Sequence, residues 1–519
     1  MFTIRQSIDE KLYNLLVTRL DGFRLNSEAY RASIIELVKK GIGGLIVFGG
    51  VLDEVKSFIG ELQGISGDRL IIASDVERGV GQQIQGATKF PCQMAMAAAI
   101  SRDIPAEVTL IKSAVEAIAS ESIDVGINMP LIPVMDVNRN RNNPIICTRA
   151  FSDDPKIVAS MGSLFVEVLE RMGLLSCVKH FPGHGDTSTD SHITVPVITK
   201  TEEELFDVDI FPFAEAIKSG TSSVMVGHLC VPALDDLLLS TISPAIIKGL
   251  LREKLGFNGL IVTDALNMDA LKAIGNVAAK CLNAGVDILL HPMVADQTVA
   301  ELRSALISGF LGENTVESAL ERLGRFKAHL AQMANPVEKT RPAQPGKRRA
   351  TCYEKHRAIA REIMEKSITL VKGEGFSLQG TRRLILSGES KYCESSPLTD
   401  FFENCSNIRD DVADAAGKSV VVAVFTSVAA WRGSSGLPLS DIDIVRGIIN
   451  RASHSIVISF GSPYVLDHFC DADVLVAAYD ETFEVQSAVI RCLMGEIPFR
   501  GRLPIAPAIK MELPKSNCL

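Results

Sequence analysis

LLSCVKHFPGHGDTSTDSH (174–192) joins an apolar run to a loop rich in imidazole and carboxylate groups. Its first part, LLSCV (174–178), is typical of a buried strand. Glycine and proline at 182, 183 and 185 predict that a loop follows. The stretch holds three of the nine histidines of the chain and two aspartates. Folds place binding and catalytic groups on such loops, so the stretch predicts a functional site at the end of a strand.

Similar apolar runs recur along the first 330 residues, with amphipathic helical stretches between them. They lie at residues 43–50, 70–77, 126–133, 174–181, 222–229, 259–266 and 286–292. Their hydrophobicity is continuous, which is typical of parallel strands covered by helices on both faces. Seven runs in about 300 residues favour an α/β fold of the (β/α)8 TIM-barrel type, and an eighth strand is expected near residues 17–24. A doubly wound sheet is the alternative.

Polar residues mark the ends of these expected strands. Five of them lie at or just beyond the carboxyl ends: Asp75, Asp136, His180, His228 and Asp264. In a barrel these ends converge on the face that carries the site of barrel enzymes. The pattern therefore supports the barrel and predicts one shared site.

A change of composition divides the chain. Residues 334–350 contain three prolines and several basic residues without apolar periodicity, which is typical of an exposed linker. This predicts a catalytic barrel at residues 1–333 and a smaller α/β sandwich domain at 351–519. In the second domain a helix is expected at 353–369, and strands at 383–387, 419–426, 455–460 and 474–479.

Composition narrows the classes of function. A net charge of −9 argues against nucleic acid or an anionic membrane as the main partner. No run approaches the roughly 20 apolar residues that span a bilayer, and residues 1–10 lack the apolar core of a signal peptide. Eleven scattered cysteines without a C-x-x-C pair are typical of reduced thiols, which predicts a cytoplasmic location.

Two features could carry chemistry. Asp264 follows a buried run, where a carboxylate is either used functionally or caps the next helix. Asp190 and His192 could form a carboxylate–imidazole dyad for proton transfer, or they could lie in a solvated loop. The histidines and aspartates of 180–192 are also metal-ligand types, but their spacing matches no known zinc motif and Lys179 would oppose a cation. We therefore expect no metal.

The histidine loop also matches a known family. KHFPGHGDTSTDSH (179–192) resembles K-H-F-P-G-H-G-D-T-x-x-D-S-H, the signature of glycoside hydrolase family 3 β-N-acetylglucosaminidases of the NagZ type. VTDALNM (262–268) resembles the nucleophile segment, and RAFSDDP (149–155) resembles the family's R-x-F-S-D-D-P. The tail resembles the second domain of the longer members. The family's D-Q-E-G-G-R-V is altered here to DVERGVG (75–81), which predicts a remodelled rim of the pocket.

The resemblance implies a role for each matching residue. Asp264 would be the nucleophile, and His192, oriented by Asp190, would be the general acid and then the general base. Residues implied in binding the sugar are Asp75, Arg149, Lys179, His180, His228 and Met268. No cofactor is implied.

The implied activity is that of a retaining exo-β-N-acetylglucosaminidase, a β-N-acetylhexosaminidase. It would release N-acetylglucosamine from muropeptides, as in peptidoglycan recycling, or from chitooligosaccharide-like β-glycosides. One alternative is a phosphorylase using the same residues, because His192 would repel phosphate less than a carboxylate base would. Another is a sugar-binding protein that has lost catalysis.

Overall fold

The computed structural model describes residues 7–100, 105–189, 195–338, 345–373, 378, 383–388, 396–402, 404–409, 415–426, 428 and 436–506. The chain forms two compact units. The first contains Met1–Phe90, Lys112–Val137 and Val158–Arg357. The second contains Pro91–Ile111, Asn138–Ile157 and Ala358–Leu519.

The described part of the first unit holds eight short parallel strands. They are β1 (Leu16–Asp21), β2 (Gly44–Phe48), β3 (Ile71–Ser74), β4 (Met129–Pro130), β5 (Cys177–Phe181), β6 (Ser223–Val226), β7 (Leu260–Thr263) and β8 (Leu289–Leu290). They pair in the orders β4-β3-β2-β1-β8 and β5-β6-β7. Parallel bridges from Val134 to Lys179 and from Val262 to Ile288 join the two groups. The strands therefore follow one another around a closed (β/α)8 barrel, and the predicted fold class is confirmed.

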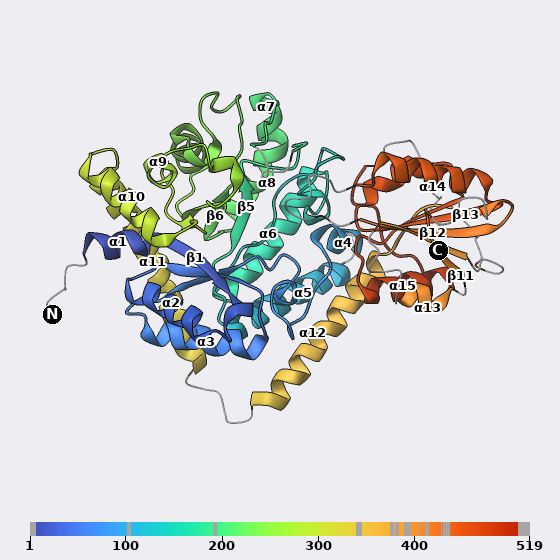
Figure 1. The fold of residues 1–519 in the computed structure, drawn as a ribbon, viewed down its shortest axis with the longest axis horizontal. Coiled ribbons are helices and arrows are strands. Elements are labelled where there is room, and N and C mark those ends of the chain that lie inside the picture. The colour runs from blue at the N-terminus through green and yellow to red at the C-terminus, as the bar shows by residue number, and fades with distance from the viewer. Residues whose placement is uncertain are drawn as a thin grey trace. The chain divides into compact units, whose positions relative to one another are not determined.

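Helices cover the outside of this barrel (Figure 1). They are α1 (Ile8–Asn14), α2 (Glu28–Lys39), α3 (Leu52–Ile65), α5 (Pro105–Val125), α6 (Pro155–Arg171), α7 (Glu202–Glu204), α8 (Phe211–Lys218), η6 (Ala245–Lys254), α9 (Val277–Ala284), α10 (Ala295–Ile307) and α11 (Glu313–Glu338). Most of them bury apolar residues against the strands, whereas α7 is a short acidic turn that buries none. In α6, for example, Val158, Phe165 and Leu169 are buried.

The second unit is built on a sheet with the order β11-β10-β12-β13-β14-β9. Its strands are β9 (Thr369–Lys372), β10 (Arg383–Ser387), β11 (Asn404–Asn407), β12 (Ser419–Phe425), β13 (His454–Phe460) and β14 (Val474–Ala477). All pairs are parallel except that of β9 with β14. Helix α14 (Leu439–Arg451) lies on one face, with α13 (Pro397–Phe401) and α15 (Phe483–Leu493) on the other (Figure 1).

Two segments from the amino-terminal half of the sequence belong to this second unit. One contains α4 (Gln93–Ala98) and the other contains the short helix η3 (Cys147–Arg149). Cys92, Met94 and Cys147 are buried in the same core as the sheet residues of the second unit. Division of the chain at residues 334–350 did not anticipate these segments.

Helices also occupy most of the expected linker. Helix α11 extends to Glu338, and α12 (Pro345–Ser367) begins seven positions later.

Candidate active site

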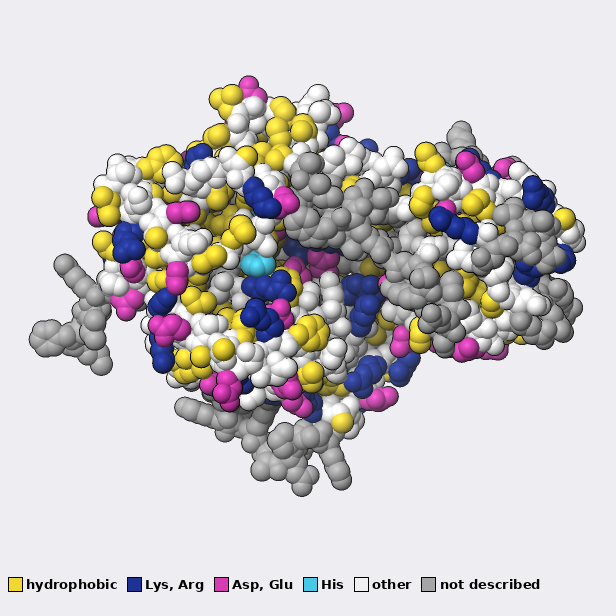
Figure 2. All heavy atoms as spheres, viewed as in Figure 1, with side chains coloured by type: hydrophobic (Ala, Val, Ile, Leu, Met, Phe, Trp, Pro, Cys, Tyr) yellow, Lys and Arg dark blue, Asp and Glu magenta, His cyan; other side chains and the backbone are white. Residues whose placement is uncertain are grey.

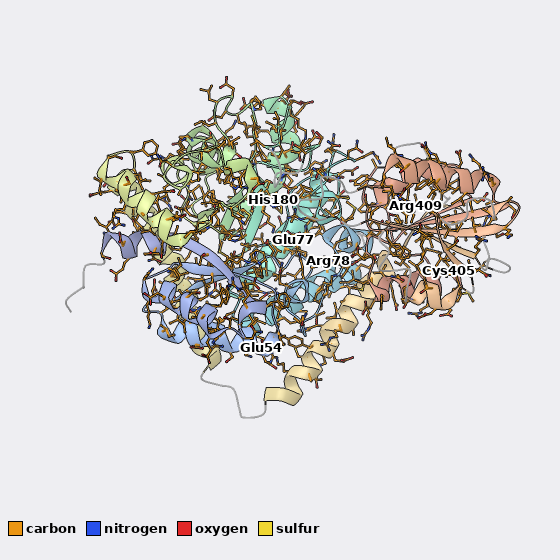
Figure 3. The ribbon with its side chains drawn as sticks, viewed as in Figure 1. Glu54, Glu77, Arg78, His180, Cys405 and Arg409 are labelled. Atoms are coloured by element: carbon orange, nitrogen blue, oxygen red, sulfur yellow. The ribbon has the colours of Figure 1, made fainter. Side chains whose placement is uncertain are left out.

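The carboxyl ends of the barrel strands carry the predicted polar residues of the first unit. Asp75 follows β3, His180 lies in β5, His228 follows β6 and Asp264 follows β7. Figure 3 shows Glu77 and His180 near the middle of the barrel. In Figure 2, acidic and basic side chains gather in a hollow on this part of the surface, beside a histidine. The barrel therefore brings these groups to the face where barrel enzymes bind substrate.

Lys179 forms a buried ion-pair group with two carboxylates. Its side chain is 1% exposed, and its Nζ lies 2.6 Å from Asp75 Oδ1 and 2.7 Å from Glu77 Oε1. A buried ammonium group is costly unless it is paired, so the two carboxylates stabilise it. Glu77 is buried, whereas Asp75 is 30% exposed and so remains accessible to a ligand. Lys179 therefore holds Asp75 in a fixed position at the barrel mouth.

Asp136 is fully buried and connects two histidines of the loop. Its Oδ2 lies 2.7 Å from His180 Nδ1, and its Oδ1 accepts the His184 backbone N–H at 2.7 Å. Burial opposes ionisation, but His180 and His184 outweigh it and hold the pKa of Asp136 below its ordinary value. An ionised carboxylate only accepts hydrogen bonds, so His180 Nδ1 carries a hydrogen. Asp136 thereby fixes the orientation of the His180 ring.

His184 shapes the loop from inside. Burial lowers the pKa of its imidazole to about 4, so it is neutral at neutral pH. Its Nδ1 lies 2.9 Å from Thr187 Oγ1, three residues further along the loop. The turn between His180 and His184 contains Gly183 with φ +127°, where a Cβ atom would lie 2.7 Å from the Cβ of Asp209. The loop therefore requires glycine at this position.

Asp264 is held just beyond β7 by its backbone. Its N–H donates to Val226 O at 3.0 Å, and its Oδ1 accepts the Ala265 N–H at 2.7 Å. Its side chain is partly exposed at the barrel mouth. Nearby in β5, burial is the main cause that raises the pKa of the Cys177 thiol to about 12; Asp75 and Asp264 act in the same direction, and Ser223 and Lys179 oppose it.

His228 and Met268 pack around the Asp264 segment. His228 Nε2 lies 3.2 Å from Ala265 O, and its Nδ1 lies 2.7 Å from Thr241 Oγ1. Met268 is 1% exposed, and its N–H donates to the same carbonyl oxygen of Ala265 at 3.3 Å. These contacts fix the turn that follows the carboxylate.

The remaining predicted residues lie elsewhere or are not described. Arg149 belongs to the second unit, where its Nη1 donates to Ile145 O at 3.0 Å. Asp190 and His192 lie outside the described residues, so the dyad stays a prediction.

In the described ranges, no group of three or more histidine, cysteine, aspartate and glutamate side chains is placed to hold a metal ion. No helix in the described part of the chain combines the length and apolar character needed to cross a membrane.

Comparison with known sequences gives a family match. Residues 7–326 match the N-terminal domain of glycosyl hydrolase family 3. A β-N-acetylglucosaminidase/β-glucosidase of Cellulomonas fimi is 28% identical, over 89% of this chain and 88% of that protein. β-Hexosaminidase A of Pseudoalteromonas piscicida is 33% identical, over 59% of this chain and 54% of that protein.

A solved structure gives a similar result. It is a glycoside hydrolase family 3 β-N-acetylglucosaminidase from Paenibacillus sp. str. FPU-7, with a TM-score of 0.82 and 27% sequence identity. The alignment covers 98% of this chain and all of that one. The similarity therefore extends over both compact units.

Proposed function

Because the chain belongs to glycosyl hydrolase family 3, we propose that it is a retaining exo-β-N-acetylglucosaminidase. The observation that carries the proposal is the position of Asp75, Lys179 and Asp264 towards the carboxyl ends of three strands of the barrel, with Lys179 and Asp75 in an ion pair. A partly exposed carboxylate beside fixed hydrogen-bonding groups is what a covalent glycosidase mechanism needs. The names of the Cellulomonas and Paenibacillus relatives support N-acetylglucosamine as the sugar.

Asp264 is the nucleophile in this mechanism. Its carboxylate attacks the anomeric carbon, the bond to the leaving group breaks, and a glycosyl-aspartate forms with inversion. The Ala265 N–H on Oδ1 orients the carboxylate so that Oδ2 can attack. Water then attacks the same carbon with a second inversion, which gives net retention.

Proton transfer is assigned to His192 and Asp190. His192 protonates the leaving-group oxygen in the first step and takes a proton from water in the second. Asp190 orients the imidazole and stabilises its charged form. A neutral histidine adds no negative charge beside Asp264, unlike the second carboxylate of most glycosidases.

The sugar is bound by groups at the barrel mouth. Asp75 accepts hydrogen bonds from sugar hydroxyls, and Lys179 holds that carboxylate in place. His180 presents an imidazole whose orientation is set by Asp136. His228 and Met268 hold the turn that carries the nucleophile. Arg149 is also proposed as a sugar-binding residue, on the strength of its R-x-F-S-D-D-P motif.

The proposed substrates are muropeptide fragments or chitooligosaccharide-like β-glycosides. The described cysteines are all free thiols, which supports a reducing compartment and hence recycling of cell-wall fragments in the cytoplasm. No cofactor takes part in the mechanism. Incubation with and without phosphate distinguishes hydrolysis, which releases N-acetylglucosamine, from phosphorolysis, which releases its 1-phosphate.

The direct test replaces Asp264. We expect Asp264→Ala to lower kcat on an aryl β-N-acetylglucosaminide by at least about 10³-fold, because the covalent route is lost. Asp269→Ala is the matched control, since that exposed aspartate lies five residues away and pairs with Lys272 on the surface. Near-normal turnover by Asp264→Ala would overturn the proposal, as would an equal loss in the control.

A further inference from the structure

A cysteine, a histidine and a glutamate of the first unit form a connected group on two helices, α5 and α12. Cys352 Sγ lies 3.3 Å from His356 Nε2. The other ring nitrogen, His356 Nδ1, lies 2.8 Å from Glu121 Oε1. Cys352 and His356 are four residues apart on α12 and therefore share one face of the helix.

Glu121 fixes the state of the histidine ring. Its side chain is 1% exposed, and its second oxygen, Oε2, accepts the Thr88 N–H at 2.8 Å. The carboxylate is thus anchored and accepts from His356 Nδ1, which leaves Nε2 facing the sulfur. A nucleophile, a base within hydrogen-bond reach and a carboxylate that orients the base make up the arrangement that activates catalytic cysteines.

Other described cysteines lie in different surroundings. Cys177 and Cys281 are fully buried, and burial raises the pKa of each thiol to about 12, so both keep their protons. Cys405 is exposed, and its sulfur lies 3.4 Å from Phe402 O, a carbonyl that cannot take a proton. Cys352 is partly exposed and lies beside a histidine nitrogen that can take the thiol proton.

We propose that Cys352 is a reactive thiol that undergoes exchange with low-molecular-weight disulfides. His356 Nε2 takes the thiol proton as the sulfur attacks one sulfur of the disulfide. A new S–S bond forms at Cys352, the S–S bond of the reagent breaks, and the released thiolate takes up a proton. The small disulfide is the only oxidant required. This site is separate from the glycosidase residues, so it stands or falls independently of the proposed function.

The test is site-resolved labelling of the intact protein. It is treated with limiting dithiobis(nitrobenzoic acid), quenched and digested, and the occupancy of each cysteine is followed by mass spectrometry. General-base catalysis is typically worth about 10²-fold or more, so we expect Cys352 to react at least about tenfold faster than the more exposed Cys405. A rate equal to or below that of Cys405 overturns the proposal without any variant.

Variants then assign the cause. His356→Gln should reduce the labelling rate of Cys352 to that of Cys405, whereas His329→Gln, at an exposed position of α11, should leave it unchanged. Circular dichroism and hydrolysis of an aryl substrate check that each variant folds. If His356→Gln fails to fold, Glu121→Gln replaces it, and a slower Cys352 is again expected. Unchanged labelling of Cys352 in a folded variant would contradict the role of His356.

Discussion

Lys179 supports the sharpest quantitative prediction, because its buried ammonium group faces two carboxylates. Lys179→Met removes the cation but keeps most of the side-chain volume, so Glu77 and Asp75 lose the charge that lies within 2.7 Å of both. Breaking a buried pair by removing one partner costs about 3–5 kcal/mol. For a unit of this size that lowers the Tm by roughly 4–8 °C.

A double-mutant cycle separates the ion pair from simple loss of packing. Glu77→Gln alone should cost about 1.5–3 kcal/mol, because a charged hydrogen bond is lost. In the double variant no charge remains buried at position 77. Its loss of stability should therefore be about 1–3 kcal/mol smaller than the sum of the losses in the two single variants. Asp75 is partly exposed, so solvent screens its interaction with Lys179 and reduces its contribution to stability.

Differential scanning calorimetry of the four proteins measures these values. Lys218→Met is the control, because Lys218 is 71% exposed and pairs with Glu215 on the surface. It should change stability by less than about 0.5 kcal/mol. The reasoning fails if Lys179→Met costs less than about 1 kcal/mol or if the two substitutions are additive.

Three further predictions follow from buried polar groups. Asp136→Asn should lower kcat/KM on an aryl β-N-acetylglucosaminide about 10–100-fold, because an amide no longer fixes Nδ1–H of His180. Nitrogen NMR of the imidazole should show a changed tautomer of His180, and an unchanged spectrum would contradict this. His184 has a folded pKa of about 4 against 6.5 unfolded, so the unfolded state binds the proton first and stability is lost as pH falls from 6.5 towards 4. In urea titrations between these pH values, His184→Asn should lose about 3 kcal/mol less of its free energy of unfolding than the unsubstituted protein does. If the two proteins lose the same amount, the prediction is refuted. Asp287→Ala removes the buried partner of Arg252 just before β8 and should lower the free energy of unfolding by about 3–5 kcal/mol. KM should stay unchanged, and a raised KM would show that the substitution also disturbs the active site.

The barrel was predictable because its strands are continuous apolar runs bounded by turns. The strand with the weak signal, β1, is interrupted by Arg19 and Asp21, which lie at its carboxyl end where the mouth admits solvent. The edge strand β11, NCSN (404–407), was missed because it is polar and largely exposed. Its pairing with β10 depends on backbone hydrogen bonds that no side-chain pattern reports.

The loops after β3 and β4 could not be assigned from local patterns. Met94 and Cys147 look like ordinary core residues of the barrel, and only tertiary packing shows that they are buried in the second unit.

The ends of the expected strands predicted much of the candidate site, but they did not predict which of its side chains contact one another. Asp136 was expected at the barrel face, yet its contact with the His184 backbone depends on how the loop after β5 folds back. Glu77 was overlooked as a partner of Lys179, although its place two residues after Asp75 at a strand end was a usable signal.

Trapping of the glycosyl-enzyme tests directly whether Asp264 is the nucleophile. The protein is incubated with a fluorinated N-acetylglucosaminyl fluoride that slows release of the intermediate, and its intact mass and peptides are measured. We expect a stoichiometric adduct of one sugar residue on Asp264 in the peptide containing VTDALNM (262–268), and none in Asp264→Asn. An adduct on another residue, or rapid turnover of the reagent by Asp264→Asn, would contradict it.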